Sequence, residues 1–119
     1  MAKKQLGSSG MNDGMARKWG AVSLVIHADI DQCDVLDMRR VADCLIKIPA
    51  EVTSLTFYTC DEEDGEYDYI KDNTGAARLV DVTGDEGHWI QFPSAVYAAG
   101  FVKIIPAGAN GTAKIQGKS

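Results

Sequence analysis

The sequence predicts an all-β fold: a single antiparallel β-sandwich or jelly roll of about eight short strands, preceded by an extended N-terminal arm. Short segments alternate apolar and polar residues, which is the period of a strand with one buried face. Glycine, proline, asparagine and aspartate punctuate these segments at intervals of about 8–12 residues, as in sandwiches. No long segment carries the period of an amphipathic helix. These three observations together predict the fold class.

Length and composition limit the chain to one globular domain. It has 119 residues, of which 45% are hydrophobic and 24% are charged, with a net charge of -5. This hydrophobic fraction is too high for a disordered protein, and the chain is too short for two ordinary domains. No run approaches the roughly 18 apolar residues that a membrane-spanning helix needs, so we expect no membrane partner.

Charge divides the chain into two unequal parts. Residues 1–18 carry four basic side chains and one acidic side chain, a net charge of +3. Residues 19–119 carry eight basic and sixteen acidic side chains, a net charge of -8. We therefore predict a flexible basic N-terminal arm over 1–18 and a β-sandwich domain over 19–119. The arm is either a disordered tail or a segment that becomes ordered on a partner.

The first strand of the domain is expected after Trp19. Val22, Leu24 and Ile26 alternate with more polar positions and should face the core. An aspartate-rich connection over 29–37 follows, with one helical turn capped by Asp34 as an option.

The middle of the domain is predicted to form two strands and a hairpin. The side chains expected to face the core are Cys44, Ile46, Ile48, Leu55 and Phe57. Pro49 should end the first of these strands, because proline cannot donate to a sheet ladder. The second strand, over 53–60, leads into an acidic turn over 61–65 that ends in glycine.

The remaining segments are short and separated by polar turns. The expected strands cover 66–71, 78–82, 88–92, 101–105 and 112–116. Pro93 and Pro106 should each end the strand before them. In the last strand Ala113 and Ile115 should face the core.

The order of these segments resembles a family of small tailed-bacteriophage virion proteins with β-sandwich folds, which includes capsid decoration (cement) proteins. The matching segments are 45–50 (LIKIPA), 53–59 (TSLTFYT), Asp64-Gly65, 67–72 (YDYIKD), Gly75, 88–93 (HWIQFP) and 100–105 (GFVKII). The resemblance extends from about Val41 to the C-terminus. It departs from the family pattern at Cys60, where serine is expected before the acidic turn.

This resemblance implies a non-enzymatic virion structural protein, in the first place a capsid decoration protein that stabilises the head by binding across neighbouring capsid subunits. Its implied partners are the major capsid protein and further copies of itself, as a homotrimer. Its implied location is the capsid surface, after assembly in the host cytoplasm. Cys33, Cys44 and Cys60 are odd in number and lack CxxC spacing, which agrees with folding in a reducing compartment.

The basic arm is the predicted site of contact with the capsid. Its charged and apolar candidates are Lys3, Lys4, Leu6, Met11, Met15, Arg17 and Lys18. Because ordering a backbone costs about 1–2 kcal/mol per residue, the arm must bury apolar anchors or add a strand to a neighbouring sheet edge. The acidic turn could also meet a basic partner, and the protein's own arm is one candidate.

We expect no catalytic residues, no metal and no cofactor. The chain has two histidines, no nucleophile elbow and no phosphate-binding loop. His27, Asp29 and Asp31 alternate and resemble a metal set, but polar residues at these positions are expected simply to face solvent. Specific nucleic-acid binding is disfavoured by the charge of the domain.

Two alternative functions remain open. Tyr67, Tyr69 and Trp89 could stack on sugars, which would make the protein a carbohydrate-binding or receptor-contact sandwich on the virion surface. The same fold could instead serve as a tail or neck adaptor.

Overall fold

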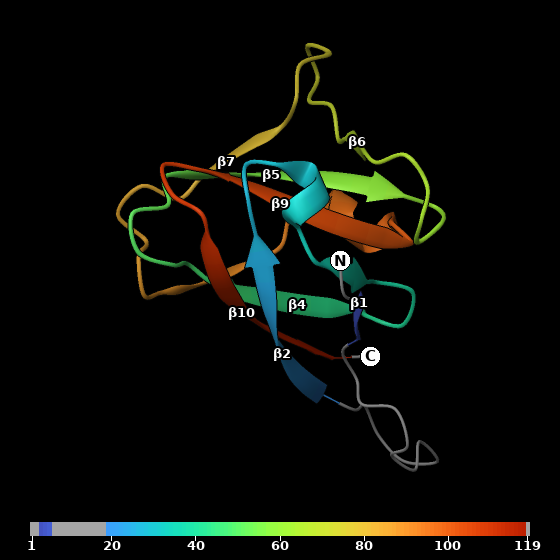
Figure 1. The fold of residues 1–119 in the computed structure, drawn as a ribbon, viewed down its shortest axis with the longest axis horizontal. Helices are drawn as coiled ribbons and strands as arrows, with labels where there is room; N and C mark the ends of the chain where they lie inside the picture. The colour runs from blue at the N-terminus through green and yellow to red at the C-terminus, as the bar shows by residue number, and fades with distance from the viewer. Residues whose placement is uncertain (1–2, 6–18, 119) are drawn as a thin grey trace.

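Strands dominate the chain (Figure 1). In the computed structural model, which describes residues 3–5 and 19–118, ten strands and two short 3-10 helices are formed. The strands are β1 (Lys3–Gln5), β2 (Trp19–Ile26), β3 (Val35–Asp37), β4 (Asp43–Lys47), β5 (Ser54–Cys60), β6 (Asp68–Tyr69), β7 (Leu79–Asp81), β8 (Trp89–Gln91), β9 (Phe101–Ala107) and β10 (Gly111–Lys118). The helices are η1 (Ile30–Gln32) and η2 (Ser94–Ala98).

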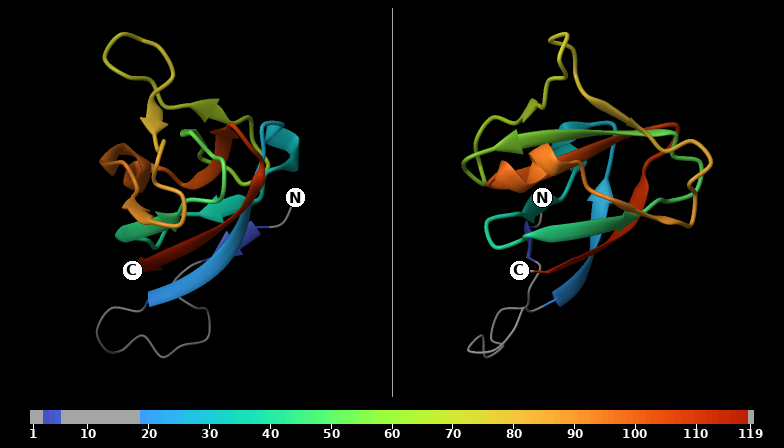
Figure 2. Two further views of the ribbon diagram at one scale, coloured as in Figure 1. Left: turned by 90° about the vertical axis from the view of Figure 1, so that its left-hand side faces the viewer. Right: turned by 180° about the vertical axis from the view of Figure 1, so that it is seen from behind.

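The strands form two sheets that pack face to face (Figure 2). One sheet has six strands in the order β1-β3-β9-β5-β6, with β7 also paired to β5. The other has four strands in the order β2-β10-β4-β8. Every strand pair is antiparallel except β1 with β3. The predicted all-β sandwich is therefore confirmed.

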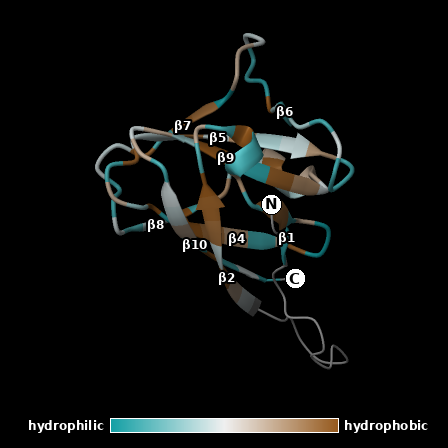
Figure 3. Ribbon diagram, viewed as in Figure 1, coloured by the Kyte–Doolittle hydropathy of each residue, from teal (hydrophilic) through white to brown (hydrophobic). Residues whose placement is uncertain are grey.

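Alternation along the strands places the core between the sheets, as the sequence predicts. Eight inward side chains of β2, β4, β5 and β10 are at most 3% exposed: Leu24, Ile26, Cys44, Ile46, Leu55, Phe57, Ala113 and Ile115. Val22, also predicted to face the core, is partly buried and packs against it. Figure 3 shows the hydrophobic stretches of β2, β4 and β9 in brown. Burial also raises the pKa of the Cys44 thiol to about 12, so this cysteine stays protonated and behaves as a small apolar side chain.

Three aromatic rings close one part of the core. Phe92, directly after β8, lies edge-on to Phe57 of β5 with ring centroids 5.1 Å apart. On its other side Phe92 stacks against Tyr97 of η2 at 6.4 Å. The Tyr97 hydroxyl accepts a hydrogen bond from the backbone N–H of Cys44 at 2.8 Å. This cluster joins both sheets to η2.

The structure has ten strands rather than the predicted eight or so, because the sequence does not predict β1 and β3 as strands. Segment β3 falls inside the predicted connection over 29–37. All three of its residues are buried, so it lacks the alternation that marks a half-exposed strand. The charged member, Asp37, is tolerated there because its carboxylate binds the Arg39 guanidinium at 2.7 Å.

The helical turn in this connection exists, but the predicted cap is wrong. Helix η1 is capped by Asp29, whose side chain accepts from the backbone N–H of Asp31. Asp34 is instead buried and accepts from the backbone N–H of Val25 at 2.9 Å. It therefore ties the start of β3 to β2.

Two further strand boundaries differ from expectation. Pro106 does not end its strand, since β9 continues to Ala107. Strand β3 pairs with β9 only at Phe101 and Val102, so Pro106 lies beyond the end of that neighbour, where a missing N–H is tolerated. The strand expected over 66–71 is reduced to β6, because its ladder with β5 covers only two residue pairs.

Gly108 follows β9 and makes a close approach to another loop. Its φ is 93°, and a Cβ added there would overlap the carbonyl oxygen of Glu51. The adjacent carbonyl of Ala107 accepts from the backbone N–H of Thr53 at 2.9 Å. Only glycine fits this position without strain.

Candidate interaction surfaces

The outward side of the four-stranded sheet carries a row of long side chains from four strands. In the ladder register, Ser23 of β2 lies opposite Lys114 of β10, Lys114 opposite Lys47 of β4, and Lys47 opposite Trp89 of β8. The next row contains Gln116, Leu45 and Gln91, and Lys118 lies opposite Asp43 beyond it. We call this surface the lysine face and define it by Ser23, Asp43, Leu45, Lys47, Trp89, Gln91, Lys114, Gln116 and Lys118.

The lysine face has the opposite charge to the rest of the domain. Three of the eight basic side chains of residues 19–119 lie on it, whereas Asp43 is the one acidic side chain of sixteen that does. Lys118 has the acidic residue Asp43 as its cross-strand register partner. Lys47 and Lys114 are left as two like charges directly opposite each other, an arrangement that destabilises a sheet.

Trp89 is the exposed aromatic residue of this face. Its side chain is 40% exposed, although large apolar side chains are usually more deeply buried. A shallow hollow next to it is lined by Ala21, Val22, Ser23, Lys114 and Gln116. The face therefore offers an apolar ring beside two ammonium groups.

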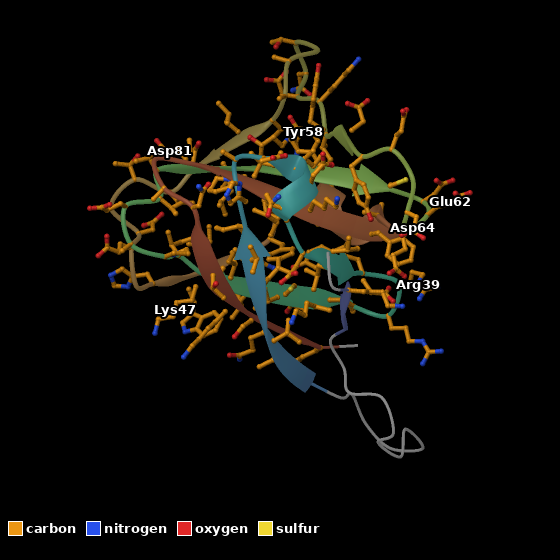
Figure 4. The ribbon with its side chains drawn as sticks, in the orientation of Figure 1. Arg39, Lys47, Tyr58, Glu62, Asp64 and Asp81 are labelled. Atoms are coloured by element: carbon orange, nitrogen blue, oxygen red, sulfur yellow. The ribbon has the colours of Figure 1, made fainter. Side chains whose placement is uncertain are left out.

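The second charged surface consists of the acidic turn over 61–65 and the adjacent Glu66, between β5 and β6; from here on the name acidic turn covers residues 61–66. Here the Lys3 ammonium lies 3.4 Å from the Glu63 carboxylate. The arm thus meets the acidic turn of its own chain, which is one of the partners that the sequence suggested for this turn. Figure 4 shows Arg39, Glu62 and Asp64 on this side of the molecule, and Lys47 on the opposite side.

Tyr67 anchors the acidic turn to the sheet. Its hydroxyl donates to the carbonyl oxygen of Glu63 at 2.8 Å, and the Lys103 ammonium lies 4.8 Å from its ring centroid. The pKa of Tyr67 is raised to about 12, mainly because burial desolvates the phenol. The nearby acidic groups of Cys60, Glu63 and Asp64 raise this pKa further. A neutral phenol and a cation–π contact therefore link the turn to β9 of the six-stranded sheet.

The predicted arm residues are only partly described. Lys3 and Lys4 lie in β1, paired with Val35 and Leu36 of β3. The other candidates lie outside the described residues: Leu6, Met11, Met15, Arg17 and Lys18.

The predicted aromatic set is not brought together. Trp89 belongs to the four-stranded sheet, while Tyr67 and Tyr69 lie at the β6 edge of the six-stranded sheet. The ring of Tyr69 instead contacts Tyr58 edge-on at 5.9 Å. The three side chains therefore do not form one sugar-stacking surface.

The histidine and aspartate set of the sequence serves local structure. The His27 ring nitrogen Nδ1 accepts from the backbone N–H of Asp29 at 2.9 Å, and Asp29 caps η1. Over residues 3–5 and 19–118, no three His, Cys, Asp or Glu side chains gather in a way that could hold a metal ion. All three cysteines are free thiols. No helix in this part of the chain is long and apolar enough to cross a membrane.

Sequence reasoning missed the lysine face. Alternation does place Lys47 on the outward side of its strand and Lys114 on the outward side of another. Their proximity depends on the pairing of β4 with β10, two strands that are far apart in the sequence. No local signal in either segment specifies that pairing.

Replacing Lys47 with glutamate should stabilise the isolated chain. The substitution turns a repulsive cross-strand pair with Lys114 into an attractive one, and we expect the free energy of unfolding to rise by about 0.2–1 kcal/mol. Urea denaturation at a low protein concentration measures this change. K71E, at an exposed position in the β6–β7 connection, adds the same charge elsewhere and is the matched control. A larger gain in K71E than in K47E would contradict the repulsion.

The chain was compared with known proteins by sequence and by fold. No protein-family model, curated protein or solved structure matches it.

Proposed function

We propose that this protein is a non-enzymatic structural protein of a tailed-phage virion, a capsid decoration protein that binds the major capsid protein across neighbouring subunits. Copies associate with each other as a homotrimer on the capsid surface. The family resemblance over about Val41 to the C-terminus is one support for this proposal. The observation that carries it is β1, a strand that the N-terminal arm adds to the edge of the domain.

Strand β1 is weakly held in its present place. Its ladder with β3 covers three residue pairs, and Lys3–Glu63 is its recorded ion pair. Both partners of that pair are about one-third exposed, so it contributes about 0–1 kcal/mol. Releasing β1 is therefore inexpensive, and pairing it with a neighbouring sheet edge would restore the same backbone hydrogen bonds.

A capsid lattice would make such weak contacts effective. When many copies lie side by side on the lattice, a copy that has made one contact is already close to the site of its next contact. The overall affinity is therefore higher than that of any single contact. The acidic domain would at the same time discourage non-specific association with nucleic acid. No catalytic group is needed for this role.

Removing residues 1–18 should abolish capsid binding while the sandwich remains folded. Full-length and truncated proteins are mixed with undecorated capsids, and the bound fraction is measured by co-sedimentation, after the amount of each protein that sediments without capsids is subtracted. E63Q is the matched variant, because it removes the ion pair but keeps the arm; we expect it to bind at least as well as the wild type. Failure of the full-length protein to sediment would overturn the decoration role, and equal binding by the truncated form would remove the arm from it.

The alternative functions predict other results in the same system. A tail or neck adaptor would be present in few copies per particle, whereas a decoration protein covers the head. A carbohydrate-contact role would have to depend either on Trp89 or on Tyr67 and Tyr69, since Trp89 lies in one sheet and the two tyrosines lie at the edge of the other. Neither alternative uses β1.

A further inference from the structure

The pair formed by Lys47 and Lys114 has a cost that no ion pair among the described residues relieves. The two residues are register partners on the outward side of β4 and β10. Neither ammonium forms an ion pair within the part of the chain that the structure describes. An anionic group placed between them would offset the repulsion.

The acidic turn supplies unpaired anionic groups. Glu63 is bound to Lys3, but Glu62, Asp64 and Glu66 are exposed and form no ion pair among the described residues. Three acidic side chains elsewhere in the domain accept hydrogen bonds from backbone N–H groups: Asp72 from Thr74, Asp81 from Thr83, and Glu86 from Glu51. In the acidic turn, by contrast, three exposed carboxylates without an ion pair among the described residues lie within five consecutive positions.

The two surfaces cannot meet within one molecule. Lys47 and the pair Glu62 and Asp64 lie on opposite sides of the protein (Figure 4). Tyr67 and Lys103 also fix the turn to the six-stranded sheet. A second copy of the chain can bring them together.

We infer that the lysine face of one copy binds the acidic turn of the next, in a head-to-tail contact. Glu62 and Asp64 of one copy lie against Lys47 and Lys114 of its neighbour, and Trp89 is covered at the rim. Because the two surfaces differ, an open assembly keeps a free lysine face at one end and a free acidic turn at the other until the contacts close into a ring. Three copies related by rotation would close such a ring.

This inference rests on the self-association included in the proposed function, and it assigns the surfaces that mediate it. It does not depend on the capsid, so the purified full-length protein is sufficient to test it. Light scattering after size-exclusion chromatography gives the mass of the assembly, and analytical ultracentrifugation over a concentration series gives the association constant.

Charge reversal on either surface should disrupt the assembly. We expect K47E/K114E and E62K/D64K each to lower the association constant by at least about tenfold, because like charges then face each other across the contact. The control R40E/K71E changes the net charge by the same amount as K47E/K114E at exposed positions outside both surfaces, and it should remain assembled. Circular dichroism and thermal unfolding show whether each variant is folded.

The decisive variant combines all four substitutions. K47E/K114E/E62K/D64K exchanges the charges of the two surfaces and leaves the net charge at that of the wild type, so assembly should return. Raising the ionic strength from about 0.1 M to about 1 M should weaken the wild-type assembly, since the Debye length falls from about 10 Å to about 3 Å.

Several results would overturn the inference: a wild-type protein that stays monomeric at every concentration, an assembly that survives K47E/K114E, or a quadruple variant that is folded but monomeric. Capsid co-sedimentation separates this failure from failure of the proposed function. A monomer that still binds capsids through residues 1–18 would retain the decoration role and exclude the head-to-tail contact.

Discussion

Replacing Phe92 with alanine is expected to lower the free energy of unfolding by about 3–5 kcal/mol, the range for truncating a buried aromatic side chain. Phe92 is 3% exposed, and its ring contacts both Phe57 and Tyr97. The substitution would open a cavity where the two sheets and η2 meet, and polar Tyr97 would lose its stacking partner. Chemical denaturation followed by circular dichroism measures the change.

Two variants show whether the loss arises from the core. F92L keeps most of the buried volume and should cost about half as much or less. W89A removes a large ring from the outward side of β8, the strand that immediately precedes Phe92. Because Trp89 is already 40% exposed, the substitution should cost clearly less than F92A, about 1–2 kcal/mol in the monomer. A W89A variant as destabilised as F92A would mean that Trp89 is part of the core.

Replacing Gly108 with alanine should destabilise the fold by more than about 2 kcal/mol. The added methyl group would overlap the Glu51 carbonyl, and an L-residue at a φ of 93° is strained in addition. Relief would require moving the loop that holds Thr53 against Ala107, which joins the start of β5 to the end of β9. Thermal unfolding of the purified variant provides the measurement.

A substitution at Gly84 separates the effect of backbone strain from that of steric overlap. Its φ is 85°, close to that of Gly108, but a Cβ there would meet nothing within 4 Å. G84A therefore carries the backbone strain alone, about 1 kcal/mol, while G108A carries strain and overlap together. Equal losses in the two variants would show that the approach to Glu51 has no energetic effect.

Most of the domain's fold could be predicted from local patterns. Alternation identified the inward side chains Leu24, Ile46 and Ile115 because each lies in a strand with one buried face. It failed at β3, where Leu36 and Asp37 are both buried and no alternation exists. It also failed at Pro106, which does not end β9. The neighbouring strand β3 has already ended there, and local alternation does not show where a neighbouring strand ends.

The candidate surfaces could be predicted only where a single segment contains them. The acidic turn is visible in the sequence, as is the excess of basic charge in the arm. The sequence also suggests the arm as one partner of the turn, and Lys3 and Glu63 form such a contact. The lysine face is assembled by long-range pairing of β10 with β2 and β4, so its charge becomes apparent only in the folded sheet. Long-range strand pairing also determines that Trp89 lies in one sheet while Tyr67 lies at the edge of the other.

Strand β1 has a consequence for the solubility of the protein. An open sheet edge can pair with other chains without limit, and short strands rich in lysine are among the means by which proteins prevent this. With β1 in place, the edge of the six-stranded sheet is a three-residue strand bearing Lys3 and Lys4. Without it, β3 would present Val35 and Leu36 at an uncovered edge. The strand that we propose for exchange with neighbours is therefore also a guard against aggregation, and purified protein lacking it should precipitate more readily than the full-length chain.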